Sequence, residues 1–449
     1  MKLSLPILAL VAMHSLFAQT NSVSKFFPYP WTADTLSNGL RVVTVPTEHK
    51  NLVAFYIVVR VGSRNEVEPG KSGFAHFFEH MMFRGSENFT PDQRDAIMKE
   101  AGAEANAYTS DDRTVYHALF SVQDLEKIME LEADRFQRLK YAEPEYKTEA
   151  LAVLGEYNKN NANPINKLWE VLRSEAFATH TYKHTTMGFI QDIREMPDHF
   201  EYSREFYRRY YRPEYTTLLL VGDVAREKVL ELTQRYFGKW ERSDYKPNIP
   251  VEPPQSKARS ASVDWPSPTL PYVVVAYRGP AYSEQKKDKA ALDFLVPIAF
   301  GENSDLYQKL VLKEQKVDML VPAFDDQIDP ELFAVVARVK EVKDVDSVRD
   351  AIVATFERFA NEKVPQEKLD ETRAHIRYAT ALSWTSAGAN AGFLAPYIAL
   401  GGTPQTVDRV FALYQQITPK DIQDNAKRYF TSENRTIVTL ATKPKEETK

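Results

Sequence analysis

Apolar residues follow two different spacings in the first half of the chain. Residues 41–45 and 52–61 are dense in valine, isoleucine and aromatic side chains, which is typical of buried strands. The Asn38-Gly39 pair just before the first of them predicts a hairpin turn. Apolar residues three and four positions apart then predict helices, at 72–83, 91–101, 123–140 and 144–160. Strands followed by a run of helices are typical of an α+β fold.

The second half of the chain repeats this plan. Its pattern predicts a strand at 272–277, helices around 286–300 and 304–314, a strand at 332–339 and then long helices.

An internal repeat supports this division. Arg209-Tyr210-Tyr211-Arg212-Pro213-Glu214 aligns with Arg428-Tyr429-Phe430-Thr431-Ser432-Glu433, 219 positions later. In the same register Thr217-Leu218-Leu219 falls on Thr436-Ile437-Val438. Both segments have the pattern of a helix end, a turn and a buried strand, which predicts two homologous halves.

We therefore predict two homologous layered α/β domains, each a mainly antiparallel sheet with helices packed on it. The N-terminal domain is expected at 30–242 and the C-terminal domain at 261–445, since 449 residues are too many for one ordinary core. Between them lies a linker at 243–260. Four prolines in its polar segment 243–256 predict an extended, semi-rigid connection.

Composition excludes some classes of function. The 62 acidic and 57 basic residues leave a net charge of −5 without any block of like charge, so nothing favours nucleic acid as a partner. The chain contains no cysteine, so disulfides are excluded and stability must come from core packing. Without thiolates, the side-chain ligands of any metal ion would have to come mainly from histidine and carboxylate.

The N-terminus has the pattern of a secretory signal peptide at 1–18. Lys2 gives a basic start, an apolar run extends to Phe17, and the small residue Ala18 precedes a polar segment. The apolar run is short for a membrane span, and an uncleaved membrane anchor is the alternative. A lipoprotein anchor would need a cysteine. We expect cleavage after Ala18 and an exported, soluble protein of the periplasm or cell envelope.

Candidate chemistry lies on the helix predicted at 72–83. His76-Phe77-Phe78-Glu79-His80 reads H-x-x-E-H, the inverted form of a zinc-peptidase motif. Residues four apart share one helix face, so His76 and His80 can bind one metal ion. Glu79 can accept a proton from a metal-activated water without being a ligand. The alternative is an apolar helix with two incidental histidines.

A carboxylate pair follows on the helix predicted at 144–160. Glu149 and Glu156 are seven residues apart, which returns them to one helix face after about two turns. The residues between them are largely apolar, so a solvated surface does not explain the pair. One carboxylate can bind the metal and the other can hold a ligand imidazole from behind.

These motifs resemble the pitrilysin, insulysin and mitochondrial processing peptidase family, the inverzincins. The segment Gly102 to Asp111 is similar to the family's N-A-x-T edge strand, and 209–223 is similar to the helix-to-strand passage that closes its first domain. The resemblance runs from about Leu36 to the C-terminus. It implies one Zn²⁺ per chain and a catalytic N-terminal domain. By the same resemblance the zinc ligands are His76, His80 and Glu156, the base is Glu79, and Glu149 is the carboxylate that holds a ligand imidazole in place.

The resemblance also implies where a substrate binds. Extended peptide backbone would pair with the edge segment Ala105, Asn106, Ala107, Tyr108 and Thr109, which favours unfolded peptides. The alternative for this segment is an ordinary half-buried strand. His180 and His184 are also four apart, but the polar residues around them predict a loop rather than a metal-binding helix.

The second half departs from family members that act alone. At an offset of 217 positions, His76, Glu79 and His80 correspond to Asp293, Val296 and Pro297, so we expect no metal there. Asp305 and Met319 stand where those members carry a substrate-gripping arginine and tyrosine.

This departure predicts a zinc-bearing catalytic subunit of a heterodimer. An arginine and a tyrosine can donate hydrogen bonds to an oxyanion, whereas Asp305 and Met319 cannot. A homologous partner chain would therefore supply the missing Arg/Tyr pair. The rival is a homodimer that dispenses with those donors. We therefore expect a zinc endopeptidase. The alternatives are a non-catalytic assembly or binding subunit of the same fold, and zinc-dependent hydrolysis of a non-peptide amide.

Overall fold

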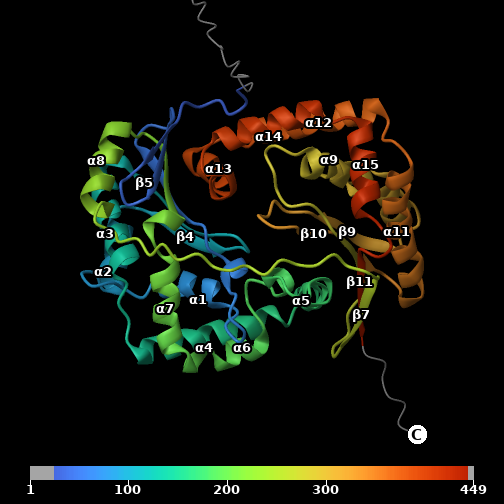
Figure 1. Ribbon diagram of the computed structural model, residues 1–449, viewed down its shortest axis with the longest axis horizontal. Helices are drawn as coiled ribbons and strands as arrows, with labels where there is room; N and C mark the ends of the chain where they lie inside the picture. Colours follow the sequence, from blue (N-terminus) through green and yellow to red (C-terminus); the bar gives the residue numbers. More distant parts are fainter. Residues whose placement is uncertain (1–24, 443–449) are drawn as a thin grey trace, which may run out of the picture.

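A computed structural model describes residues 25–442, and its two β-sheets are each packed with helices. The first sheet lies on the left of Figure 1 and the second on the right. The prediction of an α+β fold with two mainly antiparallel sheets is confirmed. The signal peptide predicted at 1–18 lies outside the described residues. Within 25–442, no helix has both the length and the apolar character needed to cross a membrane.

The first sheet has six strands in the order β1-β2-β6-β3-β5-β4. Only β2 and β6 run parallel, and every other neighbouring pair is antiparallel. The β1–β2 turn contains Gly39 with a positive φ of 90°, as the Asn-Gly pair predicts. The strand bounds are β1 Thr32–Thr35, β2 Arg41–Pro46, β3 Leu52–Val59, β4 Glu104–Thr109, β5 Thr114–Ser121 and β6 Thr216–Gly222.

The second sheet repeats this topology with five strands in the order β7-β11-β8-β10-β9. Its parallel pair β7–β11 corresponds to β2–β6, and its antiparallel strands β8, β10 and β9 correspond to β3, β5 and β4. β4 and β9 therefore end their sheets at equivalent edges. The strand bounds are β7 Arg259–Trp265, β8 Tyr272–Arg278, β9 Val317–Ala323, β10 Leu332–Val339 and β11 Arg435–Thr442.

Between residues 25 and 242 the first half has eight α-helices, and several of them pack on one face of its sheet. The core between them contains Phe74, Phe77 and Phe78 of α1, all fully buried. The bounds are α1 Phe74–Met81, α2 Pro91–Glu100, α3 Leu125–Arg138, α4 Glu143–Asn160, α5 Pro164–Ala176, α6 Ile190–Glu195, α7 Phe200–Tyr210 and α8 Arg226–Phe237.

The second half differs from the pattern prediction where helices were expected around 286–300 and 304–314. The first becomes α9 followed by a π-helical segment Val296–Phe300, and the second a short α10 followed by a π-helical segment Gln308–Lys313. Pro297 lies inside the first segment and has no N–H for an α-helical bond. The bounds are α9 Lys287–Leu295, α10 Asp305–Tyr307, α11 Val345–Asn361, α12 Gln366–Leu382, α13 Ala387–Gly401, α14 Gln405–Gln416 and α15 Pro419–Tyr429.

One helix from each half packs on the sheet of the other half. The second face of the first sheet packs against α13, with Leu394 and Ile398 fully buried. The second face of the second sheet packs against α5, with Leu168 and Leu172 fully buried. Figure 1 shows α13 beside the first sheet and α5 beside the second. The two halves therefore share their hydrophobic cores.

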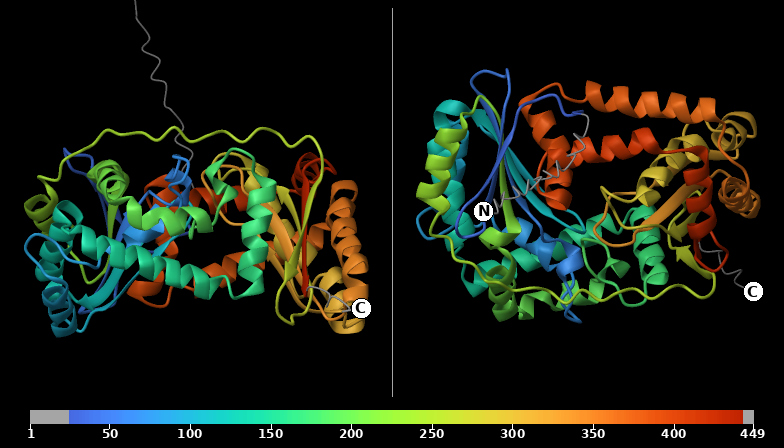
Figure 2. Two further views of the ribbon diagram at one scale, coloured as in Figure 1. Left: turned by 90° about the horizontal axis from the view of Figure 1, so that it is seen from below. Right: turned by 45° about the horizontal axis from the view of Figure 1, so that its top comes forward.

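Between α8 and β7, residues 243–258 form neither helix nor strand. They cross from one half to the other along the surface, as the left view in Figure 2 shows. Glu252 anchors this segment by accepting hydrogen bonds from the backbone N–H groups of Ala178, Thr179 and His180 at 2.7–2.9 Å.

Candidate metal centre

The helix α1 carries His76, Glu79 and His80 and is held at its start by a buried carboxylate. Gly73 precedes the helix with φ 91°, a conformation that favours glycine. Glu66 accepts hydrogen bonds from the N–H groups of Gly73 and Ala75, both at 2.7 Å. Because Glu66 is 4% exposed, it fixes the first turn of α1 from inside the protein.

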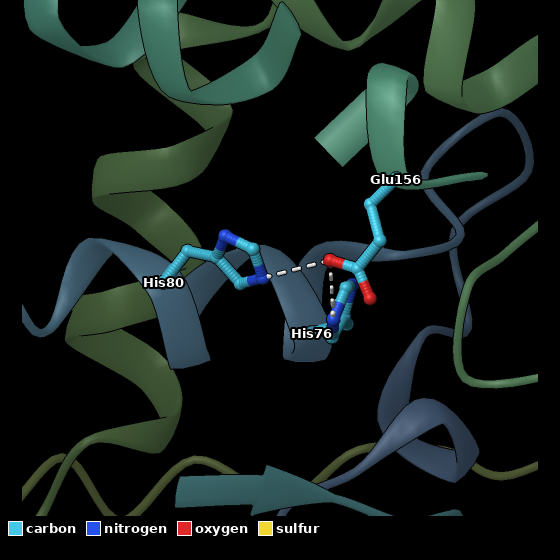
Figure 3. Close-up of side chains that lie close together, drawn as sticks. All are labelled: His76, His80 and Glu156. Atoms are coloured by element: carbon cyan, nitrogen blue, oxygen red, sulfur yellow. Dashed lines mark ion pairs between the residues drawn. The ribbon is translucent and has the colours of Figure 1, made fainter. Parts of the chain in front are cut away.

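His76, His80 and Glu156 converge between α1 and α4 (Figure 3). Oε2 of Glu156 lies 3.7 Å from Nε2 of His76 and 3.3 Å from Nε2 of His80. The three potential ligand atoms all lie within 4.8 Å of one another, the one such group found among residues 25–442. Two ligand atoms of a tetrahedral zinc ion lie about 3.3 Å apart, from bonds of about 2.0 Å. The three donor atoms therefore fit a tetrahedral zinc ion and would leave its fourth coordination position open.

The second carboxylate of α4 holds His80 from behind. Nδ1 of His80 is 2.8 Å from Oε1 of Glu149, so Nδ1 donates to the carboxylate and leaves Nε2 free to bind a metal. The guanidinium of Arg84 donates to the other oxygen of Glu149. Burial opposes ionisation of Glu149, but the hydrogen bonds from His80 and Arg84 lower its pKa. Glu149 therefore stays a carboxylate.

Burial determines the charge of His76. It lowers the pKa of His76 to about 4, and the neighbouring His80 acts in the same direction. His76 is therefore a neutral imidazole at neutral pH, which is the form that binds a metal.

Glu79 lies beside this group without belonging to it. Its Oε2 accepts a hydrogen bond of 2.6 Å from the hydroxyl of Thr109 in β4. Burial raises the pKa of Glu79, and the bond from Thr109 opposes that rise.

A cavity of about 380 Å³ opens at this point. His76, Glu79 and Glu156 line it together with Ala107, Tyr108 and Thr109 of β4. Of the five predicted substrate-binding residues, these three line the cavity at the candidate metal centre. Ala105 and Asn106 lie earlier on the same edge strand and line a separate, much smaller cavity. β4 pairs only with β5, so its outer edge has no strand partner in 25–442.

Comparison with known proteins identifies the family. Residues 41–189 match the family described as insulinase (peptidase family M16), and residues 200–376 match the peptidase M16 inactive domain. The zinc protease PqqE of Helicobacter pylori is 31% identical over 417 residues, covering 90% of this chain and 91% of that protein. This chain belongs to peptidase family M16. The resemblance drawn from the sequence is thus confirmed.

Other M16 proteins agree in sequence and fold. The beta subunit of the mitochondrial-processing peptidase of Bos taurus is 29% identical over 221 residues, covering 49% of this chain and 44% of that one. The crystal structure of a protease from Helicobacter pylori has a TM-score of 0.85 and 30% identity, covering 93% of this chain and 100% of that one.

Two further side chains at this site, Arg84 and Asn160, were not predicted from the sequence. Arg84 supports Glu149, as described above, and Asn160 donates a hydrogen bond of 3.4 Å to Oε1 of Glu156. Each stands four residues after a residue of the motif, His80 or Glu156. That spacing was a usable signal, because residues four apart on a helix are neighbours.

The equivalent place in the second half holds a buried ammonium group, that of Lys289. Asp293, which aligns with His76, pairs with the buried Lys289 at 2.5 Å and accepts a hydrogen bond from Tyr414. Lys289 also pairs with Asp326 at 2.9 Å. A buried salt bridge therefore occupies this helix face.

The other residues singled out from the sequence lie away from the cavity. Asp305 is exposed and pairs with Arg358, and Met319 packs against the cluster around α5. His180 and His184 lie in the loop around a 3₁₀ turn, where His180 contacts Asp329 of the second half at 3.0 Å.

Proposed function

We propose that this M16 chain is a zinc-dependent endopeptidase that cleaves extended or unfolded peptides. The observation that carries the proposal is the convergence of His76, His80 and Glu156, with the carboxylate of Glu79 beside them and an unpaired strand edge at the same cavity. The names of similar proteins, which include zinc proteases, support it.

His76, His80 and Glu156 would hold the ion and Glu149 would orient His80. Zinc, when bound, supplies a Lewis acid that activates water and polarises a carbonyl group. Glu79 would accept the proton of the attacking water on its free oxygen, because Oε2 is held by Thr109. The same oxygen would then deliver that proton to the leaving amine, so the carboxylate returns to its starting state.

Substrate backbone would add to the first sheet along β4. Main-chain pairing with Ala105–Thr109 reads extended conformation rather than sequence, so unfolded peptides are the expected substrates. The hydroxyl of Thr109 donates a hydrogen bond to Glu79 from this strand, so a peptide paired with β4 would lie beside the proposed base.

A homologous partner chain would complete the site. Neither Asp305 nor Met319 lines the cavity, and neither side chain can donate to a developing oxyanion there. We propose that the partner supplies an Arg/Tyr pair, with a homodimer as the alternative. The N-terminal pattern of residues 1–18 supports export to the periplasm or cell envelope.

The test compares the purified zinc-loaded chain with its Glu79→Gln variant on a library of unstructured fluorogenic peptides. The wild type is expected to cleave, alone or with its partner, and Glu79→Gln is expected to bind zinc stoichiometrically without turnover. Cleavage by the chain alone would remove the need for a partner. Equal activity of both proteins would remove Glu79 from the mechanism. Zinc binding without cleavage, even beside a homologous chain that carries Arg and Tyr, would favour the non-catalytic subunit.

A further inference from the structure

A separate cavity of about 420 Å³ opens between α7 and the connection from α3 to α4. It shares no residue with the metal cavity. None of its lining residues is acidic, and we call it the basic aromatic cavity. Its lining residues are Leu139, Lys140, Tyr141, Phe200, Arg204, Tyr207 and Arg208.

The three cations of this cavity have little carboxylate around them. Lys140 and Arg208 are exposed and form no ion pair with another residue of 25–442. Arg204 meets Glu201 at 3.8 Å, but both side chains are more than half exposed, so the pair contributes little. By contrast, Arg209 of the same helix is held by two glutamates. In a chain with a net charge of −5, positive charge is therefore concentrated at this cavity.

The spacing along α7 places the arginines together. Phe200, Arg204 and Arg208 are each four residues apart, so they share one face of the helix. Lys140 lies on the facing connection. A guanidinium group binds phosphate oxygens in pairs, so two arginines one turn apart and a facing lysine suit a group with several anionic oxygens.

The tyrosines of the cavity offer ring surface rather than hydroxyl groups. Ser203 donates to the carbonyl of Phe200 at 2.6 Å, so the hydroxyl of Tyr141 donates to Ser203, at 2.8 Å. The hydroxyl of Tyr207 donates to the carbonyl of Phe136 at 2.8 Å. Both hydroxyls are thus used within the protein, and the walls of the cavity are apolar.

The hydrophobic core holds these walls in place. The ring of Tyr146 in α4 is fully buried and packs against the rings of Tyr141 and Phe200, at 6.5 and 5.5 Å between centroids. On its other side it packs against Phe77 of α1, at 5.0 Å. The cavity is therefore formed before a ligand arrives, which lowers the cost of binding.

We propose that the basic aromatic cavity binds an organic phosphate. The phosphate group would face the three cations, and the apolar part of the ligand would lie against the aromatic rings. Inorganic phosphate would use only the cations and an uncharged aromatic compound only the rings, whereas a phosphate ester uses both. A soluble aryl phosphate and a phospholipid headgroup share this chemistry. The site is independent of the proposed peptidase function.

Phosphorus NMR titration of the zinc-loaded chain at low ionic strength tests the cations. The probes are phenyl phosphate and inorganic phosphate at pH 8, where both are dianions because the second pKa of a phosphate group is about 6. Arg208→Gln and Lys140→Gln should each weaken the binding of both probes about tenfold, the effect of one charge-assisted hydrogen bond. Lys99→Gln is the matched control, since Lys99 is exposed on α2 and forms no ion pair within 25–442, and it should bind like the wild type.

The ratio of the two affinities tests the rings. The wild type is expected to bind phenyl phosphate about tenfold more tightly than inorganic phosphate, because the phenyl group adds apolar contact. Phe200→Leu keeps an apolar side chain but removes a ring. It should reduce this ratio and leave the affinity for inorganic phosphate unchanged.

Short-chain phosphatidic acid distinguishes the two sources of the ligand. Dihexanoyl phosphatidic acid, kept below the concentration at which it forms micelles, presents one lipid phosphate without a membrane. Tighter binding of this lipid than of phenyl phosphate, lost in Arg208→Gln, would support a lipid headgroup. The reverse order would support a soluble aryl ester.

Three results would overturn the proposal. The first is a wild type that binds neither ester. The second is an equal loss of affinity in Lys99→Gln and Arg208→Gln, which would mean attraction to surface charge in general. The third is binding that disappears when a chelator removes the zinc, which would place the phosphate at the metal centre. Because Lys140 and Arg208 are exposed, their substitutions test the cavity without disturbing the core.

Discussion

The orientation of His80 depends on a chain of charged side chains behind it. Nδ1 of His80 meets Glu149, and Glu149 in turn meets Arg84. Only 5% of the Glu149 side chain is exposed, so without its two partners it would be an uncompensated buried charge. Arg84 is 46% exposed and brings the neutralising charge from the surface. This arrangement supports the His80 tautomer that a metal needs.

Replacing Glu149 tests this support. Glu149→Gln removes the charge that polarises His80, and zinc affinity is expected to fall by about ten- to hundredfold. Competition titration against a chelator measures the change. Glu143→Gln, on an exposed position of the same helix, should bind zinc like the wild type. Unchanged affinity in Glu149→Gln would mean that His80 is oriented by its own helix alone.

Thr109 gives a second prediction at this scale. Thr109→Val removes the hydroxyl that holds Oε2 of Glu79 but keeps the shape of the side chain. We expect kcat to fall by about tenfold, the effect of one hydrogen bond to a charged group, with zinc content and KM unchanged. Thr109→Ser should restore kcat. A loss that appears in KM instead would place Thr109 in substrate binding only.

The candidate site was predictable from sequence where its parts are close along a helix. His76 with His80, and Glu149 with Glu156, are each visible as helical spacings. The bond between Thr109 and Glu79 joins residues 30 positions apart and depends on how α1 packs against β4. Trp169 and Glu331 meet at one cavity only because the two halves dock. Spacing rules carry no information on such contacts.

Among the elements, α13 shows the same limit. Its sequence AGANAGFLAPYIALG is apolar on all sides, which indicates a buried helix. The pattern cannot say which sheet buries it, and α13 packs against β3 and β6 of the other half. The strands β2, β3, β8 and β10 lie close to their predicted positions because short apolar runs between turns are informative by themselves.

Replacing Leu394 in α13 tests how much the packing of this helix on the first sheet contributes to stability. Its side chain is fully buried against the first sheet. Leu394→Ala should lower the free energy of unfolding by about 2–5 kcal/mol, from lost burial and the cavity left behind. Denaturant titration followed by circular dichroism measures it. Leu382→Ala removes an equal side chain that is 77% exposed, and should change stability by less than about 0.5 kcal/mol. Equal effects of both would contradict a shared core.

On the scale of the whole molecule, polar contacts also hold the two halves together, in addition to the apolar packing of α5 and α13. The N–H of Ile328 in the second half donates to Asp112 of the first at 2.7 Å, and Tyr182 donates to the same carboxylate. Arg64 pairs with Asp329 at 2.5 Å. Both contacts hold the connection between β9 and β10 against the first half, so the docking of the halves rests on polar as well as apolar contacts.

The linker should therefore be dispensable once the chain has folded. A protease site inserted at the exposed Asn248 allows the connection to be cut without touching the segment anchored by Glu252. Because α5 and α13 each complete the core of the opposite half, the two fragments are expected to co-elute in gel filtration and to keep the peptidase activity of the uncut protein. The N-terminal fragment expressed alone should aggregate, since the apolar sheet face that α13 covers would meet water. Separation of the cut fragments, or a soluble and stable N-terminal fragment, would mean that each half folds as an independent unit.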